Sequence, residues 1–362
     1  MSKDKRNSAI FVNGGAGRLI ASIPALELFE KENPDDDFVI VCEGGTDFYK
    51  GHPTLYKRAY DHWHKGLFED KLKTRNLITP EPYRVYEYYN QQCSIAEAYD
   101  ISINNKGLRE LPRPRIRLSR EEMMFGKKLV DEVKEKTKKD KVVVFQPFGR
   151  TVHHENGMIS DYSGRSFEAE NAVNIVKKIS KKFGVIHMAE FGIDFNKHDC
   201  KEPVASPMGA SLRHWAGIVA SADYFLGCDS SGQHMVHALE KKATVVIGST
   251  YPVNVSYPGD ENIDILDMGE GARVYSPIRL THDEYSDRVN DGIMAMNDKV
   301  EDIIVQSVTN GLTGKERIGG TLATSIYCAS QGIQILSCLL YTSPSPRDSW
   351  ASRMPSSALK KK

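Results

Sequence analysis

A short polar cluster with the residue types of a ligand-binding turn stands between two apolar runs, within residues 226–250 (LGCDSSGQHMVHALEKKATVVIGST). Apolar residues with helical spacing follow the cluster, so it is predicted to open a helix. Its members are Asp229, Ser230, Ser231 and Gly232. The free N–H groups and positive dipole of a helix N-terminus favour an anion such as a diphosphate, here at Gly232 and Gln233. An Asp or Ser in this place also serves as an ordinary N-cap, so both roles stay open.

A second set of anion ligands is predicted around residues 149–165 (GRTVHHENGMISDYSGR). This connection is long for a loop between a strand and a helix, and such loops are commonly functional. Arg150, Arg165 and Ser166 can hold a diphosphate, because a guanidinium binds two phosphate oxygens and a helix begins beside Ser166. A surface ion pair or a helix cap is the alternative for each of them.

Metal binding is not favoured by the histidine and aspartate spacings. His234 and His237 share a helix face, but no third ligand is evident, so we predict that His234 packs in the core or faces a phosphate. Three consecutive aspartates at 35–37 follow Asn33 and Pro34 in a connection from helix to strand, which is typical of a solvated turn.

These residues stand on elements that alternate between strand and helix. Residues 9–12 and 38–42 flank a glycine-rich turn and a helix at 19–32, which predicts a βαβ unit and a parallel sheet. A short strand is expected at 101–103. In the second half, strands are predicted at 142–146, 185–188, 224–226 and 244–247, and helices at 120–138, 167–182, 212–220, 233–241, 281–297 and 299–310. The pattern predicts a doubly wound α/β fold, with ligands beyond the carboxyl ends of the strands.

Composition excludes several classes of protein. The chain has 362 residues with 40% hydrophobic content, which suits two domains, and a net charge of +0 gives no reason to expect nucleic acid as a partner. The six cysteines lack close paired spacing, which indicates reduced thiols. No signal peptide or membrane span is predicted, so we expect a cytoplasmic protein that can still touch a membrane peripherally.

The expected domains are residues 1–125 and 126–310, with 311–337 unassigned. Residues 338–362 (CLLYTSPSPRDSWASRMPSSALKKK) resemble the translation of a sequencing adapter, and we expect this tail to be non-native and to lie outside the fold. A Ser/Pro-rich disordered tail is the alternative.

Three segments, in this order, resemble the heptosyltransferase-like glycosyltransferases of family 9. They are IFVNGGAGRLIASIPALELFEKENPDDDFVIVCEGG, then VVVFQPFG with GRSFEAENAVNIVKKISKKFGVIHMAEFG, and finally LRHWAGIVASADYFLGCDSSGQHMVHALEKKATVVIGSTYPVNVSYPG. In the last segment, Asp229 and His234 match an Asp and a His that the family places five positions apart. The matched order runs over roughly residues 8–310, which is rare for chance matches of short motifs.

The resemblance implies a GT-B fold, in which two Rossmann-like, doubly wound domains face each other across a cleft. It implies transfer of a heptose-like sugar or hexose from a nucleotide-diphosphate-sugar to a glycan or lipid-linked acceptor, as in lipopolysaccharide biosynthesis, with no cofactor or required metal. Glu190 is then expected near the ribose hydroxyls, and Asp229 on sugar hydroxyls or groups beside the phosphate. The first segment supplies the loop for acceptor or phosphate, Gly14, Gly15 and Gly17.

The chain departs from the family pattern at Arg18, where relatives usually carry an Asp that is taken as the base for the acceptor hydroxyl. An arginine cannot act as that base, but it can neutralise a phosphate or bind an anionic acceptor. Glu43 and Asp47, or His153 and His154, are the candidate replacements. A non-catalytic nucleotide- or sugar-binding relative, and a nucleotide-sugar epimerase or hydrolase, are the alternative functions.

Overall fold

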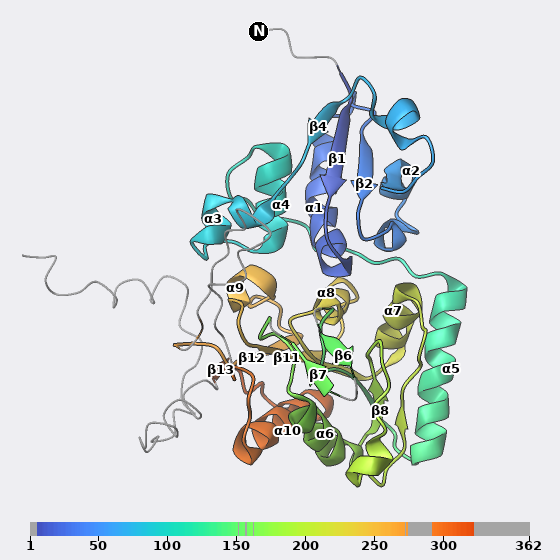
Figure 1. Cartoon of the computed structure of the whole chain (residues 1–362), viewed down its shortest axis with the longest axis vertical. Coiled ribbons are helices and arrows are strands. Elements are labelled where there is room, and N and C mark those ends of the chain that lie inside the picture. The colour runs from blue at the N-terminus through green and yellow to red at the C-terminus, as the bar shows by residue number, and fades with distance from the viewer. Residues whose placement is uncertain are drawn as a thin grey trace, which may run out of the picture.

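The computed structural model describes residues 6–150, 152–155, 158–161, 163–271, 273 and 292–321. These residues form two lobes, one above the other, each built on a parallel sheet (Figure 1). The tail at 338–362 and most of the helix predicted at 281–297 lie outside the described residues. Within the described part, no helix is long and apolar enough to cross a membrane.

The first lobe contains a four-stranded sheet in the order β3-β2-β1-β4. Its strands are β1 Ser8–Val12, β2 Val39–Cys42, β3 Ala59–Asp61 and β4 Asn76–Ile78. Its helices are α1 Ala16–Glu32, α2 Leu55–Arg58, α3 Tyr86–Tyr89 and α4 Ile95–Asn104, with short turns η1 Asp47–Tyr49, η2 Leu67–Leu72 and η3 Pro82–Arg84. The predicted βαβ unit is confirmed, because β1 pairs in parallel with β2 and α1 connects them.

The strand expected at 101–103 is wrong, because these residues belong to helix α4. Ser94 and Glu97 form a capping box, in which the Ser94 hydroxyl accepts from the Glu97 N–H and the Glu97 carboxylate accepts from the Ser94 N–H. Apolar residues at helical spacing then turn toward α1, as Ala98 and Tyr99 do. The local capping signal and the packing on α1 outweigh the β-branched pair Ile101 and Ile103.

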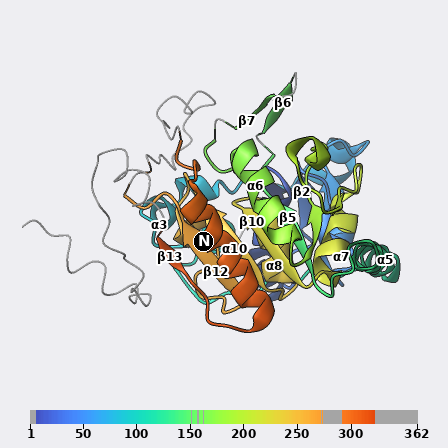
Figure 2. The same ribbon diagram turned by 90° about the horizontal axis from the view of Figure 1, so that it is seen from below.

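The second lobe contains a seven-stranded parallel sheet in the order β13-β12-β11-β10-β5-β8-β9. Its strands are β5 Val142–Gln146, β8 Gly184–His187, β9 Val204–Ala205, β10 Tyr224–Cys228, β11 Ala243–Ile247, β12 Ile263–Asp267 and β13 Gly320–Thr321. Strands β6 His153–Glu155 and β7 Met158–Ser160 form a separate antiparallel hairpin that projects from the lobe (Figure 2).

Helices cover both faces of the second sheet. On β5, Val142 and Val144 join a cluster with residues of α5, α7 and α8, whereas Val143 and Phe145 join a cluster with α6 and α10. The helices are α5 Arg120–Thr137, α6 Ala169–Ser180, α7 Leu212–Ser221, α8 Ser231–Ala238, α9 Pro252–Val255 and α10 Asp298–Thr313, with the short turn η4 Phe195–His198. The predicted doubly wound α/β architecture is therefore confirmed.

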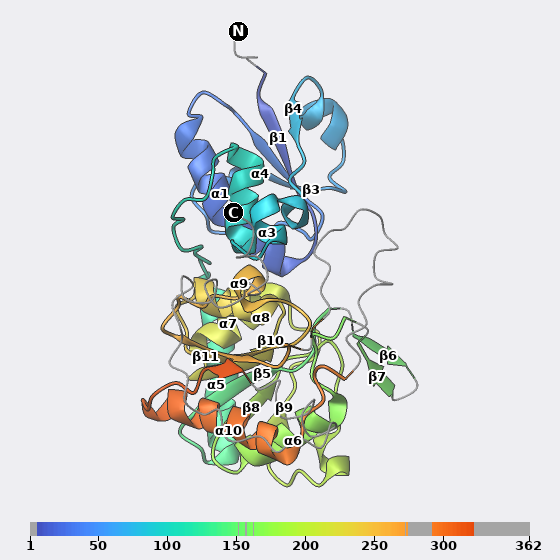
Figure 3. The same ribbon diagram turned by 90° about the vertical axis from the view of Figure 1, so that its left-hand side faces the viewer.

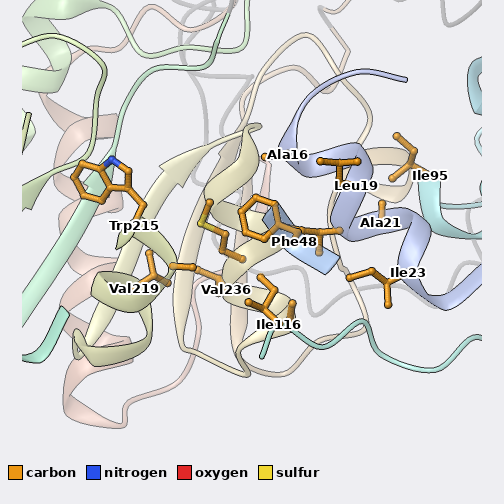
Figure 4. Close-up of a cluster of buried hydrophobic side chains, with 14 of the residues drawn as sticks. Ala16, Leu19, Ala21, Ile23, Phe48, Ile95, Ile116, Trp215, Val219 and Val236 are labelled. Carbon is orange, nitrogen blue, oxygen red and sulfur yellow. The ribbon is translucent and has the colours of Figure 1, made fainter. Parts of the chain in front are cut away.

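The two lobes share one hydrophobic core. Leu19 of α1 and Phe48 of η1 belong to the same buried cluster as Val236 of α8 and Trp215 of α7 (Figure 4). Asn254 of α9 is fully buried, and its Nδ2 donates to the carbonyl oxygens of Tyr88 (3.0 Å) and Cys93 (2.8 Å) in the first lobe. Helices α8 and α9 thus lie on the side of the second lobe that meets the first (Figure 3).

The expected boundary between residues 125 and 126 falls inside α5, which packs closely on α7. At their crossing, a Cβ on Gly126 would lie 2.1 Å from the carbonyl oxygen of Gly217, and a Cβ on Gly217 would lie 2.2 Å from that of Glu122. Backbone meets backbone here, so neither glycine has room for a side chain.

We expect Gly126→Ala to lower the free energy of unfolding by about 1–3 kcal/mol, because the added methyl group forces α5 away from α7. Urea unfolding followed by circular dichroism measures this change. Gly107→Ala is the matched control, since a Cβ there meets nothing within 4 Å, and its effect should stay within about 0.5 kcal/mol. Equal stability of the two variants would contradict the close crossing.

Candidate functional site

The loops at the carboxyl ends of strands from both lobes meet at the contact between them. A Cβ on Gly15, after β1, would lie 3.5 Å from Nη1 of Arg150, which follows β5. A Cβ on Gly17 would lie 2.6 Å from Cδ2 of His234, in α8 after β10. Glycine at position 17 therefore lets the histidine ring pack directly on the backbone of α1. The structure brings the glycine-rich turn together with Arg150 and His234, as a site between the lobes requires.

Asp229 ties together the loops of the second lobe. It follows β10 and is 5% exposed; its Oδ1 accepts from Gln233 Nε2 (2.7 Å) and its Oδ2 from Thr250 Oγ1 (2.9 Å). Burial raises the pKa of Asp229, against the opposing effect of the Arg165 guanidinium and the two hydrogen bonds. Asp229 is thus a buried carboxylate beside a half-buried cation, with both oxygens already accepting from the protein.

The N-terminus of α8 is partly capped by a side chain that the sequence did not point to. Gln146 accepts from the N–H of Gly232 through Oε1 (2.9 Å) and donates to Ser230 Oγ through Nε2 (3.3 Å). The Gly232 amide therefore already has a partner in the protein. Gln233 is fully buried, whereas Ser230 and Ser231 are half-buried. Anion binding at this helix end stays a prediction, with Ser230 and Ser231 as its accessible groups.

Arg165 lies in the same region of the second lobe. Its Nε donates to Ser163 Oγ (3.1 Å). Burial opposes the charge on Arg165, but the nearby Asp229, Tyr83 and Asp161 outweigh burial and raise its pKa. Because Tyr83 belongs to the first lobe, Arg165 lies where the lobes meet. Its guanidinium is a permanent positive charge there, which suits a phosphate group.

Ser166 organises the loop rather than facing outward. Its hydroxyl accepts from the N–H of Gly149 (2.9 Å), and its own N–H donates to Asp161 Oδ2 (3.1 Å). A cavity of about 430 Å³ lies beside it, at the N-terminus of α6. Its polar lining includes Ser160, Asp161, Ser166, Glu168 and Glu170. Three carboxylates disfavour a diphosphate in this cavity but can accept hydrogen bonds from sugar hydroxyls.

His234 is held by a short polar chain. Its Nδ1 lies 2.6 Å from Tyr257 Oη, and the ring of Tyr257 stacks on His237 at a centroid distance of 3.6 Å. Nδ1 of His237 lies 2.7 Å from Asp260 Oδ2. This arrangement fixes the His234 ring against Gly17. No cluster of three or more metal-ligating side chains was found among the residues that the structure describes.

The first lobe presents Arg18 and two acidic side chains around the glycine-rich turn. Arg18 donates through Nε to Tyr99 Oη (3.0 Å) and through Nη2 to Glu81 Oε1 (3.1 Å). Glu43 Oε2 accepts from the N–H of Gly14 (2.7 Å). Glu81 was not a candidate from the sequence, yet it lies beside the position where a base is missing.

The remaining predicted residues lie farther from this centre or on the surface. Asp47 pairs with Lys50 through Oδ1 (2.6 Å). Glu190, Arg150, His153 and His154 are exposed, and His154 stacks on Phe191 at 4.7 Å. The structure gives Glu190 no contact that tests its expected role at the ribose.

Burial, with a smaller effect of His237, lowers the pKa of His234 to about 3, below its ordinary value of 6.5. Between these values only the unfolded chain binds the proton, so the free energy of unfolding falls as pH drops from 6.5 toward 3. His234 contributes about 1.4 kcal/mol per pH unit to this slope. We expect His234→Gln to reduce the slope, measured by urea unfolding between about pH 7.5 and 5. A slope for His234→Gln identical to that of the wild-type protein would refute the buried neutral state.

Neither protein-family models nor curated protein sequences match this chain. Among solved structures, it is similar to a family 9 glycosyltransferase from Veillonella parvula, with a TM-score of 0.59 and 10% identity over 87% of this chain and 99% of that one. It is also similar to ADP-heptose lipopolysaccharide heptosyltransferase II of E. coli (TM-score 0.57, 10% identity, 85% and 99% covered). A third match is the iron-containing dodecameric glycosyltransferase TibC of enterotoxigenic E. coli. Its TM-score is 0.51 and its identity is 12%, over 86% of this chain and 77% of that one. The chain therefore has the two-lobed GT-B fold of these heptosyltransferase-like structures, as its motifs predicted.

Proposed function

We propose that this protein is a glycosyltransferase that moves a sugar from a nucleoside-diphosphate sugar to a glycan or lipid-linked acceptor. The observation that carries the proposal is the contact of the second lobe with the glycine-rich turn of the first, through His234 on Gly17 and Arg150 beside Gly15. Arg165, which interacts with Asp229 and with Tyr83 of the first lobe, adds a cation to this region. A cation and a carboxylate of the second lobe then stand opposite the loop expected to face the acceptor. The fold is the one seen in TibC bound to ADP-D-β-D-heptose, which supports a donor of this class.

In this proposal, Arg165 binds the diphosphate, and the half-buried Ser230 and Ser231 at the end of α8 donate hydrogen bonds to it. Negative charge grows on the diphosphate as the glycosidic bond breaks, so a fixed guanidinium stabilises the transition state more than the bound donor. Asp229 keeps Arg165 in place and faces the sugar. Arg150, exposed beside Gly15, adds a second positive charge. No metal is required for this chemistry, since the cations come from the protein.

The proposal includes a cytoplasmic location. Four cysteines of the described part, Cys42, Cys93, Cys200 and Cys228, are buried free thiols. Burial raises the pKa of both Cys42 and Cys93 to about 12, so these thiols stay protonated and unreactive. Such thiols suit a reducing compartment.

A non-catalytic nucleotide- or sugar-binding protein is the second candidate function. The observation that favours it is Arg18, which stands where relatives carry the catalytic Asp and is engaged by Glu81 and Tyr99. Donor turnover separates the candidates. Consumption of donor that the acceptor strongly accelerates over slow release in water supports a transferase. Consumption that is equally fast without acceptor supports a hydrolase or epimerase, and binding without turnover supports the non-catalytic protein.

Calorimetry with ADP, UDP, GDP and their sugars tests the donor site. We expect at least one of them to bind, and Arg165→Gln to weaken that binding about 10- to 100-fold, because it removes a charged hydrogen-bond donor to phosphate. Arg120→Gln, at the exposed start of α5, is the control and should bind as the wild type does. The absence of binding across the panel would overturn the proposed function.

A separate comparison tests Asp229. We expect Asp229→Ala to weaken binding of the nucleoside-diphosphate sugar more than binding of the bare nucleoside diphosphate, because in the proposed donor site this carboxylate serves the sugar and not the diphosphate. Calorimetric titration of both ligands measures the difference. An equal loss for both ligands would show that Asp229 only organises the loops through Gln233 and Thr250.

A further inference from the structure

A carboxylate from elsewhere in the first lobe, that of Glu81, lies beside Arg18, where the expected catalytic base is missing. We propose that Glu81 is the catalytic base that takes the proton from the acceptor hydroxyl, and that Arg18 is the residue that positions it. This inference rests on the proposed glycosyl transfer. It explains why an arginine can stand where the family usually carries an aspartate. The carboxylate is supplied instead by Glu81, the N-cap of η3, and is held in place by the arginine.

Arg18 fixes Glu81 beside the glycine-rich turn. The stem of Arg18 folds over Gly14, since a Cβ on that glycine would lie 2.5 Å from Cδ of Arg18. Its guanidinium lies over the ring of Tyr83, 4.9 Å from the centroid, and donates to Tyr99 Oη and Glu81 Oε1. With two hydrogen bonds and an aromatic face, the guanidinium has one preferred place, and so does the carboxylate bound to it.

One oxygen of Glu81 is left for a substrate. Oε1 accepts from Arg18 Nη2 (3.1 Å) and from the N–H of Tyr83 (3.4 Å), whereas Oε2 accepts no hydrogen bond from the residues that the structure describes. The Glu81 side chain is 33% exposed, and that of Arg18 is 14% exposed. A hydroxyl arriving from solvent can therefore reach Oε2 while Oε1 stays anchored.

Glu81 also lies on the side of the first lobe that faces the second. Tyr83, two residues further along η3, contributes to the electrostatic environment of Arg165. Arg165 in turn lies near Asp229. Through Tyr83 and Arg165, the segment that carries Glu81 is thus linked electrostatically to Asp229 of the expected donor site.

The bases predicted from the sequence are less suited than Glu81 to take the acceptor proton. Glu43 is exposed, and its Oε2 is committed to the N–H of Gly14. Asp47 is ion-paired with Lys50, and its backbone carbonyl accepts from Arg213. His153 and His154 are exposed on the projecting hairpin. Among these groups, Glu81 alone combines partial burial, a fixed rotamer and an oxygen open to substrate.

The proposed step is a direct displacement. The acceptor oxygen forms a bond to the anomeric carbon of the donor while the bond from that carbon to the phosphate oxygen breaks, and its electron pair leaves with the nucleoside diphosphate. The hydroxyl proton passes to Glu81 Oε2, which later releases it to water. The guanidinium of Arg165 stabilises the negative charge that develops on the leaving diphosphate.

The test uses the full-length protein, the nucleoside-diphosphate sugar that binds best in calorimetry, and water or azide as the acceptor. Water must lose a proton as it attacks, whereas azide is already an anion and needs no base. We expect Glu81→Gln to bind the donor as the wild type does and to release nucleoside diphosphate about 100- to 10,000-fold more slowly with water. With azide, release by the variant should return to the wild-type rate, and glycosyl azide should form.

Glu69→Gln is the matched control, an exposed glutamate of the same lobe paired with Lys73, and it should leave all rates unchanged. Unchanged release by Glu81→Gln with water, or a loss that azide does not restore, overturns the assignment of Glu81. If Glu43→Gln instead of Glu81→Gln slows release of nucleoside diphosphate with water, the catalytic base is Glu43 and the assignment of Glu81 is wrong. Failure of the wild-type protein to bind any nucleoside diphosphate overturns the proposed function itself, which is a separate outcome.

Discussion

The contact of the His234 ring with the bare backbone of Gly17 sets the geometry on which the rest of the molecule depends. It joins the first turn of α1 to the N-terminal half of α8. Each of these helices follows a strand at the centre of the sheet in its own lobe. The loop that carries Arg150 likewise lies against the glycine-rich turn, beside Gly15. A hydrogen bond between His234 Nδ1 and Tyr257 Oη holds the His234 ring on Gly17. Burial keeps this ring neutral, so the contact adds no charge beside the expected phosphate.

Much of the fold could be predicted because the buried strands are short apolar runs with clear ends. Strand β5 was predicted with its correct bounds, and α7 within one residue. The error at 101–103 arose because two isoleucines with alternating spacing also fit a helix, and packing on α1 decided between them. The capping box at Ser94 and Glu97 was the signal that could have prevented it.

The site was predictable only in part, because some of its residues are brought together from distant positions in the sequence. Asp229 and His234 stand in one motif, so their neighbourhood follows from a strand, a turn and a helix. Glu81 is 63 positions from Arg18 and lies in a segment of weak periodicity, and Gln146 reaches Gly232 across 86 positions. Pairings of that kind depend on how each lobe folds, which local spacing does not encode.

Asn254 has a consequence for how the two lobes can separate. Its amide bridges the Tyr88 and Cys93 carbonyls of the other lobe from a fully buried position. Any hinge motion that parts the lobes along this seam must release both carbonyls at once, at a net cost of about 1 kcal/mol for each bond exchanged with water. Asn254 therefore couples the two hydrogen bonds, so that α9 and the first lobe separate along this seam only when both are lost together.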